Sequence, residues 1–86
     1  MNREDCLNEA KKYVSEIKNV EYGKPENSFK VISDLWGCYL EKEITPHDVA
    51  VLMALFKIGR IKTGTHKGNN YVDCAGYIAC ACELGE

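Results

Sequence analysis

Lys57 and Arg60 are the side chains in this sequence best suited to bind an anion. They are three residues apart, and this spacing places both on one face of a helix. The surrounding segment 49–72 contains four Lys or Arg, one His and no carboxylate. A planar guanidinium and an ammonium group in acid-free surroundings suit the oxygens of a phosphate. The pattern therefore predicts a site for a phosphate-bearing ligand.

Four further residues could complete such a site. Asn69 and Asn70 lie where a last helix should begin, so their side chains and the free backbone amides of its first turn could donate to an anion. Tyr22 and Tyr77 could stack on a base or donate through their hydroxyl groups.

A structural interpretation of the same cations remains open. Lys57 and Arg60 could instead form ion pairs with Asp73 and Asp48, and they would then stabilise the fold without any ligand. The residues alone favour ligand contacts over ion pairs only modestly.

Other catalytic patterns are missing from the sequence. It contains no Gly-rich phosphate loop followed by Lys-Ser/Thr and no cysteine pair at zinc spacing. His47 and His66 are isolated. The five cysteines are odd in number, and Cys80 and Cys82 are too close to pair, so we expect reduced and mostly buried thiols.

A central helix over residues 45–62 must position the two cations. Thr45 is a suitable N-cap, Pro46 fits the first helical position, and Asp48 completes a capping box. The run 49–56 is apolar around the whole circumference, which predicts a helix enclosed by others. A chain of 86 residues has too little other material to enclose it. We therefore expect a homo-oligomer.

The rest of the chain also reads as helical. No segment alternates with the period of a strand, so the prediction is a single all-α domain over 1–86 with four helices. Asn27 or Ser28 should cap the second helix after a loop over 19–27. The three other helices are expected over 2–18, about 28–40 and about 69–84, and the last carries small residues that allow a neighbouring helix to approach closely.

Charge and the distribution of apolar residues exclude several classes of protein. A net charge of −2 and a pI near 5.7 argue against a general nucleic-acid binder. No signal peptide is apparent, and no apolar run approaches the ~20 residues of a membrane span. We expect a cytoplasmic protein, in the host cytoplasm if a phage encodes it.

Three motifs occur in order along the chain: Tyr22-Gly23-x-Pro25-Glu26-Asn27-x-Phe29, Lys57-x-x-Arg60, and Asn70-Tyr71-Val72-Asp73-x-Ala75-Gly76-Tyr77. Through them the sequence resembles a phage and prophage family of unknown function, over about residues 4–82. More distantly it resembles the MazG-like all-α nucleoside triphosphate pyrophosphohydrolases and phage nucleotide-modification-associated domains, which share a helix of the form D-x-x-x-D-hydrophobic-A-x-Y.

The resemblance implies a small four-helix, MazG-like homo-oligomer that binds a nucleotide between subunits. In the MazG-like enzymes, acids on two helices hold Mg²⁺ against the phosphates. Here Asp73 aligns with the last of those acids, Asn69 replaces its partner, and the E-x-x-E pair has no counterpart on the central helix. The resemblance therefore implies binding without efficient hydrolysis and without a required cofactor. One such role is a phage protein that sequesters a nucleotide signal of host defence.

Two alternatives remain. The first is a Mg²⁺-dependent (d)NTP pyrophosphohydrolase, in which Asp73 is catalytic and Asp73 and Asp48 are residual metal ligands. The second is a protein-binding module that docks a host protein on its apolar central helix.

Overall fold

The computed structural model describes residues 1–17, 24–64 and 68–85, and within these segments every regular element is helical. The prediction of an all-α chain is therefore confirmed, with four α-helices and one short π-helix and no strand in the described parts. The elements are α1 (Arg3–Lys12), η1 (Tyr13–Ile17), α3 (Pro25–Leu40), α4 (Pro46–Lys62) and α5 (Gly68–Leu84).

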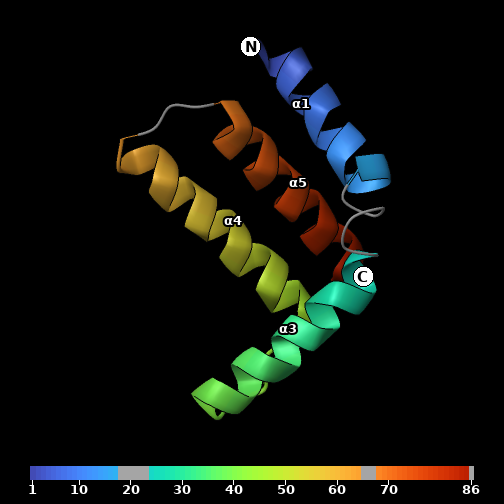
Figure 1. The fold of residues 1–86 in the computed structure, drawn as a ribbon, viewed down its shortest axis with the longest axis vertical. Coiled ribbons are helices and arrows are strands. Elements are labelled where there is room, and N and C mark those ends of the chain that lie inside the picture. The colour runs from blue at the N-terminus through green and yellow to red at the C-terminus, as the bar shows by residue number, and fades with distance from the viewer. Residues whose placement is uncertain (18–23, 65–67, 86) are drawn as a thin grey trace.

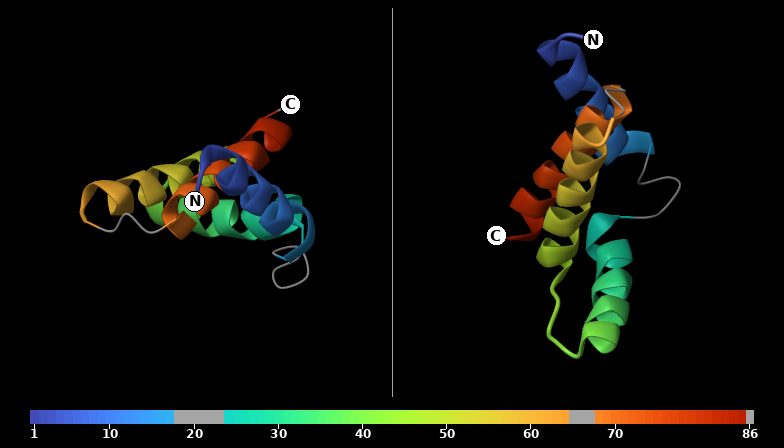
Figure 2. Two further views of the ribbon diagram at one scale, coloured as in Figure 1. Left: turned by 90° about the horizontal axis from the view of Figure 1, so that it is seen from above. Right: turned by 90° about the vertical axis from the view of Figure 1, so that its left-hand side faces the viewer.

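An antiparallel hairpin of α4 and α5 forms the centre of the molecule (Figure 1). Helix α1 packs on α5, and α3 packs on α4 from the opposite end. Figure 2 shows α3 and α1 lying at opposite ends of the hairpin's long axis. The molecule is elongated as a result, with extents of 40 × 29 × 23 Å.

Helix α4 begins as its sequence predicts. The Thr45 hydroxyl accepts a hydrogen bond from the Asp48 amide at 3.1 Å, and the Asp48 carboxylate accepts one from the Thr45 amide at 3.0 Å. These two bonds satisfy amides that the first turn leaves unpaired. The helix ends at Thr63, whose hydroxyl donates to the Gly59 carbonyl at 3.0 Å.

Helix α3 begins at Pro25, three residues before the predicted start. Asn27 and Ser28 are not caps: both lie in the first turn and donate their amides to the Lys24 carbonyl. The proline decides the start because its fixed φ suits the first helical position and its missing N–H is not needed there.

The other end of α3 is a tight turn. Glu41 takes the left-handed conformation, with φ 56° and ψ 43°, and the chain then folds back over Gly37. A Cβ atom on Gly37 would lie 2.8 Å from the Lys42 carbonyl oxygen, so this turn requires glycine at that position.

The N-terminal helix was predicted as one piece over 2–18. Asn2 and Asp5 form a capping box at its start. After Lys12 the backbone widens into the π-helix η1, where the Ser15 hydroxyl donates to the Lys11 carbonyl. Leu7 of α1 is 64% exposed.

The core is made of small side chains, which lets the helices approach closely. Val49 is the largest apolar side chain that is fully buried. A Cβ atom on Gly76 of α5 would lie only 3.1 Å from Val14, so the predicted close approach of a neighbour to the small residues of α5 is observed. The buried apolar residues are Ala10, Val49, Ala50, Ala54, Val72 and Ala81.

Part of α4 is uncovered within one chain. Leu52, Leu55 and Phe56 are 42–54% exposed, so a single chain leaves the apolar run of α4 partly uncovered. The accessible surface is 6271 Å², whereas a compact monomer of this mass exposes about 5,100 Å².

Two further expectations concern thiols and membranes. All five cysteines lie in described segments and each is a free thiol, as predicted. The expectation that they are mostly buried is wrong, because Cys38 and Cys82 are exposed and the other three are only partly buried. Among the described residues, no helix combines the length and apolar character needed to cross a membrane.

Candidate functional site

An ion pair joins the two helices of the central hairpin. The Lys57 Nζ atom on α4 lies 3.1 Å from the Asp73 carboxylate on α5, and the two side chains are 16% and 24% exposed. One residue further along α5, the Cys74 thiol donates to the Ala54 carbonyl of α4 at 3.6 Å. Together these contacts fix the antiparallel register of α4 and α5.

Phe56 brings the two cations together. The Lys57 Nζ atom lies 5.9 Å from the centre of its ring, and the Arg60 guanidinium carbon lies 5.8 Å from the same point. Both distances fall within the range of cation–π attraction. Phe56 was not predicted as a site residue, although an aromatic residue directly before Lys57 and four before Arg60 was the available signal.

The register places Arg60 level with the start of α5. Asn69 is exposed there and Asn70 is buried. The first turn of α5 contains no acidic residue. The positive end of the α5 helix dipole therefore lies at the same end of the hairpin as Arg60, and both favour an anion there.

Tyr77 lies one turn beyond Asp73 and contacts a different element. Its ring centre is 6.2 Å from that of Phe29 on α3, with the planes tilted by 37°. This contact ties α3 to α5, so Tyr77 has a packing role whatever it binds. Tyr22, the other predicted aromatic, lies outside the described residues.

Asp48 is far from Asp73. It sits in the first turn of α4, beside His47, and the His47 ring packs where a side chain on Gly85 would lie. Gly85 is twelve residues after Asp73, or about 18 Å along α5. The Thr45 backbone amide, which donates to the Asp48 carboxylate, is the main cause that holds the pKa of Asp48 below its ordinary value, and the Thr45 hydroxyl adds to it.

This separation bears on metal binding. Within the described segments, no group of three or more His, Cys, Asp or Glu side chains is arranged to hold a metal ion. A Mg²⁺ ion that holds a triphosphate needs several oxygen ligands close together. Asp48 and Asp73 of one chain do not fit that requirement.

Of the two ion pairs that the sequence allowed, the structure contains the pair between Lys57 and Asp73. Arg60 and Asp48 cannot pair within one chain, because twelve residues of α4 separate them by about 18 Å.

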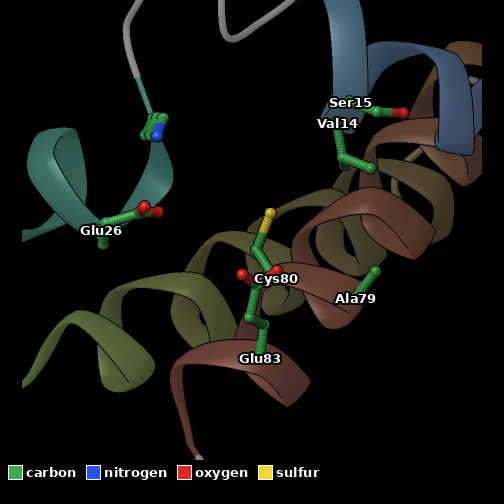
Figure 3. A pocket seen from close by; sticks show the side chains of 7 residues that line it. Val14, Ser15, Glu26, Ala79, Cys80 and Glu83 are labelled. Atoms are coloured by element: carbon green, nitrogen blue, oxygen red, sulfur yellow. The ribbon is translucent and has the colours of Figure 1, made fainter.

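A separate cavity lies at the far end of α5. It has a volume of about 380 Å³ and is open to one side (Figure 3). Glu26 approaches it from α3, and Cys80 and Glu83 approach from α5. Burial, reinforced by the two glutamates, raises the pKa of the Cys80 thiol. The cavity is lined by Val14, Ser15, Lys24, Glu26, Ala79, Cys80 and Glu83, none of which was predicted to bind a ligand.

Comparison with known proteins identifies phage relatives. The chain is 46% identical over 84 residues to the Gene 55 protein of Mycobacterium phage D29, and the aligned region covers 96% of this chain and 55% of that protein. It is 36% identical over 72 residues to the Gene 55 protein of Mycobacterium phage L5, where the aligned region covers 83% of this chain and 46% of that protein. The chain thus spans about half the length of these relatives.

No solved structure matches the chain significantly. A family described as "Domain of unknown function (DUF6378)" matches residues 5–85. Since that match includes nearly the whole chain and its curated relatives come from phages, the protein belongs to the DUF6378 family.

Proposed function

We propose that the domain binds a nucleotide, or another phosphate-bearing small molecule, at the end of the α4–α5 hairpin where α5 begins. A second subunit completes the site in this proposal. The domain binds its ligand without efficient hydrolysis and requires no cofactor to do so.

The observation that carries the proposal is the position of Lys57 and Arg60 around one half-exposed ring, that of Phe56. Arg60 offers a planar fork to phosphate oxygens, and Lys57 offers a point charge. The acid-free first turn of α5 adds backbone donors at the same end.

Asp73 sets the condition under which an anion binds. Its carboxylate partly neutralises Lys57, so a phosphate has to share that ammonium group or displace the carboxylate. Arg60 and the amides of α5 then make the first contacts, and Lys57 adds charge once the ligand is seated. The same ion pair argues against Asp73 as a metal ligand, because a cation at Asp73 would be repelled by Lys57.

The phage relatives suggest a use for such a site. A phage protein that binds a nucleotide tightly and releases it unchanged would lower the free concentration of that nucleotide in an infected cell. Sequestration of a signal made by host defence fits this description.

The test is a native mass spectrum of the protein incubated with linear and cyclic nucleotides. We expect an intact nucleotide on the wild-type protein and at least a tenfold weaker affinity for the Lys57→Ala/Arg60→Ala variant, which loses two charge-assisted contacts. Lys30→Ala is the matched control, because Lys30 lies on the exposed face of α3 and pairs only locally, with Asp34 at 2.7 Å.

The same spectrum separates the alternatives. Absence of any bound nucleotide from the whole panel refutes the proposal. Release of pyrophosphate in the presence of Mg²⁺, abolished in Asp73→Ala, would establish the pyrophosphohydrolase instead.

A further inference from the structure

We propose that α4 pairs with α4 of a second copy, antiparallel and about a two-fold axis, through a stripe formed by Leu52, Leu55, Phe56 and Gly59. The four residues follow the spacing i, i+3, i+4, i+7, which aligns them on one side of a helix. The three apolar side chains are 42%, 54% and 52% exposed, and no charged residue interrupts the stripe.

The spacing of the stripe is symmetric about its own midpoint, between Leu55 and Phe56. Two copies related by a two-fold axis at that point place Leu55 opposite Phe56 and Leu52 opposite Gly59. A two-fold interface has to be self-complementary, and this pattern meets that requirement. Each Leu52 then meets a position without a side chain, which leaves room for it.

Gly59 has no explanation within one chain. A Cβ atom on it would meet nothing within 4 Å. A glycine inside a helix is less favourable than alanine, and here no contact of the single chain requires it. Close approach of a second helix would require it, because a side chain there would separate the two backbones.

Charge favours the antiparallel direction. Helix α4 has Asp48 in its first turn and Arg60 and Lys62 in its last turn. In an antiparallel pair the acidic end of each helix lies nearer the basic end of the other, and the two helix dipoles oppose each other favourably. A parallel pair would instead bring like charges together.

The surface area fits this partner. The chain exposes roughly 1,100 Å² more than a compact monomer of its mass. A stable two-protein interface of ordinary size buries about 800 Å² on each side. The excess is therefore sufficient for one such interface.

A second exposed stripe, on α3, provides the internal control. Val31, Leu35 and Tyr39 are spaced by four residues and are 58%, 65% and 88% exposed. This stripe contains no glycine and has no symmetric midpoint with a large side chain opposite a small one. Leu35 is thus an exposed leucine on a helix, as Leu55 is, but it lies outside the proposed interface.

Sedimentation equilibrium of the wild-type chain and two variants tests the proposal. We expect self-association in the wild type, retained in Leu35→Glu and weakened by roughly 30-fold or more in Leu55→Glu, which buries a charge at the centre of the interface. Gly59→Leu should also dissociate the pair, although it should raise helix propensity. Far-UV circular dichroism checks that each variant is folded.

The outcomes are decisive in both directions. A monomeric wild-type chain overturns the proposal, and so does a subunit count that Leu35→Glu lowers and Leu55→Glu does not. A chain that associates as expected but binds no nucleotide leaves this interface intact and refutes the proposed function alone.

Cross-linking tests the direction of the helices in a Cys38→Ser/Cys82→Ser background. In the antiparallel pair, Leu55→Cys lies near the axis and should cross-link to itself. Gly59→Cys should not, because its two copies are offset by about 10 Å along the helix, beyond the reach of a disulfide. Equal cross-linking at both positions would indicate parallel helices and would overturn the antiparallel arrangement.

Discussion

The Lys57 ammonium group lies 3.1 Å from the Asp73 carboxylate, so a cation of α4 that was predicted to bind phosphate is paired with an acid of α5. This contact has two consequences that can be separated by experiment. It connects the central helices, which concerns stability, and it partly neutralises Lys57, which concerns affinity for an anion.

Removing the acid should therefore change the two properties in opposite directions. We expect Asp73→Asn to lower the free energy of unfolding by about 1 kcal/mol, since the pair is partly shielded from water. The same change should strengthen the binding of a phosphate-bearing ligand severalfold, because Lys57 is released. Urea unfolding and titration calorimetry measure the two effects.

The control for that substitution is Asp34→Asn. Asp34 also pairs with a lysine, Lys30, but both side chains are 62% exposed. We expect it to change stability by less than about 0.5 kcal/mol and affinity not at all. Loss of binding in Asp73→Asn would show that the carboxylate contacts the ligand itself.

Val49 should be the most sensitive apolar position of α4. Its side chain is fully buried among small residues, so Val49→Ala leaves a cavity that the neighbours fill poorly. We expect a loss of about 2 kcal/mol in the free energy of unfolding. Val31→Ala makes the same chemical change at a side chain that is 58% exposed, and it should cost less than about 0.5 kcal/mol in a monomeric chain. Equal losses would mean that Val49 is not in the core.

Acid should weaken the start of α4. The pKa of Asp48 is lowered by hydrogen bonds from Thr45, so the folded state binds this proton less readily than the unfolded state does. Its contribution to stability is complete above the unfolded pKa, near 3.8, and is lost as pH falls through the lower folded value. Thermal unfolding of the wild type should depend more steeply on pH below 4 than that of Asp48→Asn. Parallel curves would contradict this account.

The cysteines should react at different rates. Burial is the main cause that raises the pKa of both Cys74 and Cys80, which lowers the fraction of reactive thiolate at neutral pH. Cys38 and Cys82 are exposed. At pH 7.5, we expect iodoacetamide to modify the exposed pair first and the raised-pKa pair last, as read by peptide mass spectrometry. Early modification of Cys80 would show that the cavity beside it is more open than its contacts indicate.

Local signals predicted part of this fold well. Thr45 and Asp48 sit at a helix start because capping is decided within four residues of sequence. The start of α3 was misplaced because Asn27 and Ser28 are cap residues by type, whereas Pro25, an equally local signal, has the stronger effect at the first position. The π-helix after Lys12 has no sequence pattern of its own to predict it.

The sequence predicted which site residues share one face of α4, but not their contacts with other helices. The spacing of Lys57 and Arg60 placed both cations near each other, and the structure shows the predicted ion pair of Lys57 with Asp73. Whether either cation contacts a ligand stays a prediction. Phe56 was missed because its neighbours made it look like core. The contact of Tyr77 with Phe29 depends on how α3 crosses the hairpin, and no pattern within either helix encodes that crossing.

The left-handed turn at Glu41 affects how the molecule opens. Helix α3 ends at this turn and packs mainly on α4, whereas α4 and α5 pack mainly on each other, so the α4–α5 hairpin should persist when α3 loses its packing. Amide hydrogens of α3 should then exchange with solvent deuterium sooner than those at Val49 and Ala54. The domain would then unfold as two cooperative units rather than one, with slow amide exchange in the α4–α5 hairpin and faster exchange in α3.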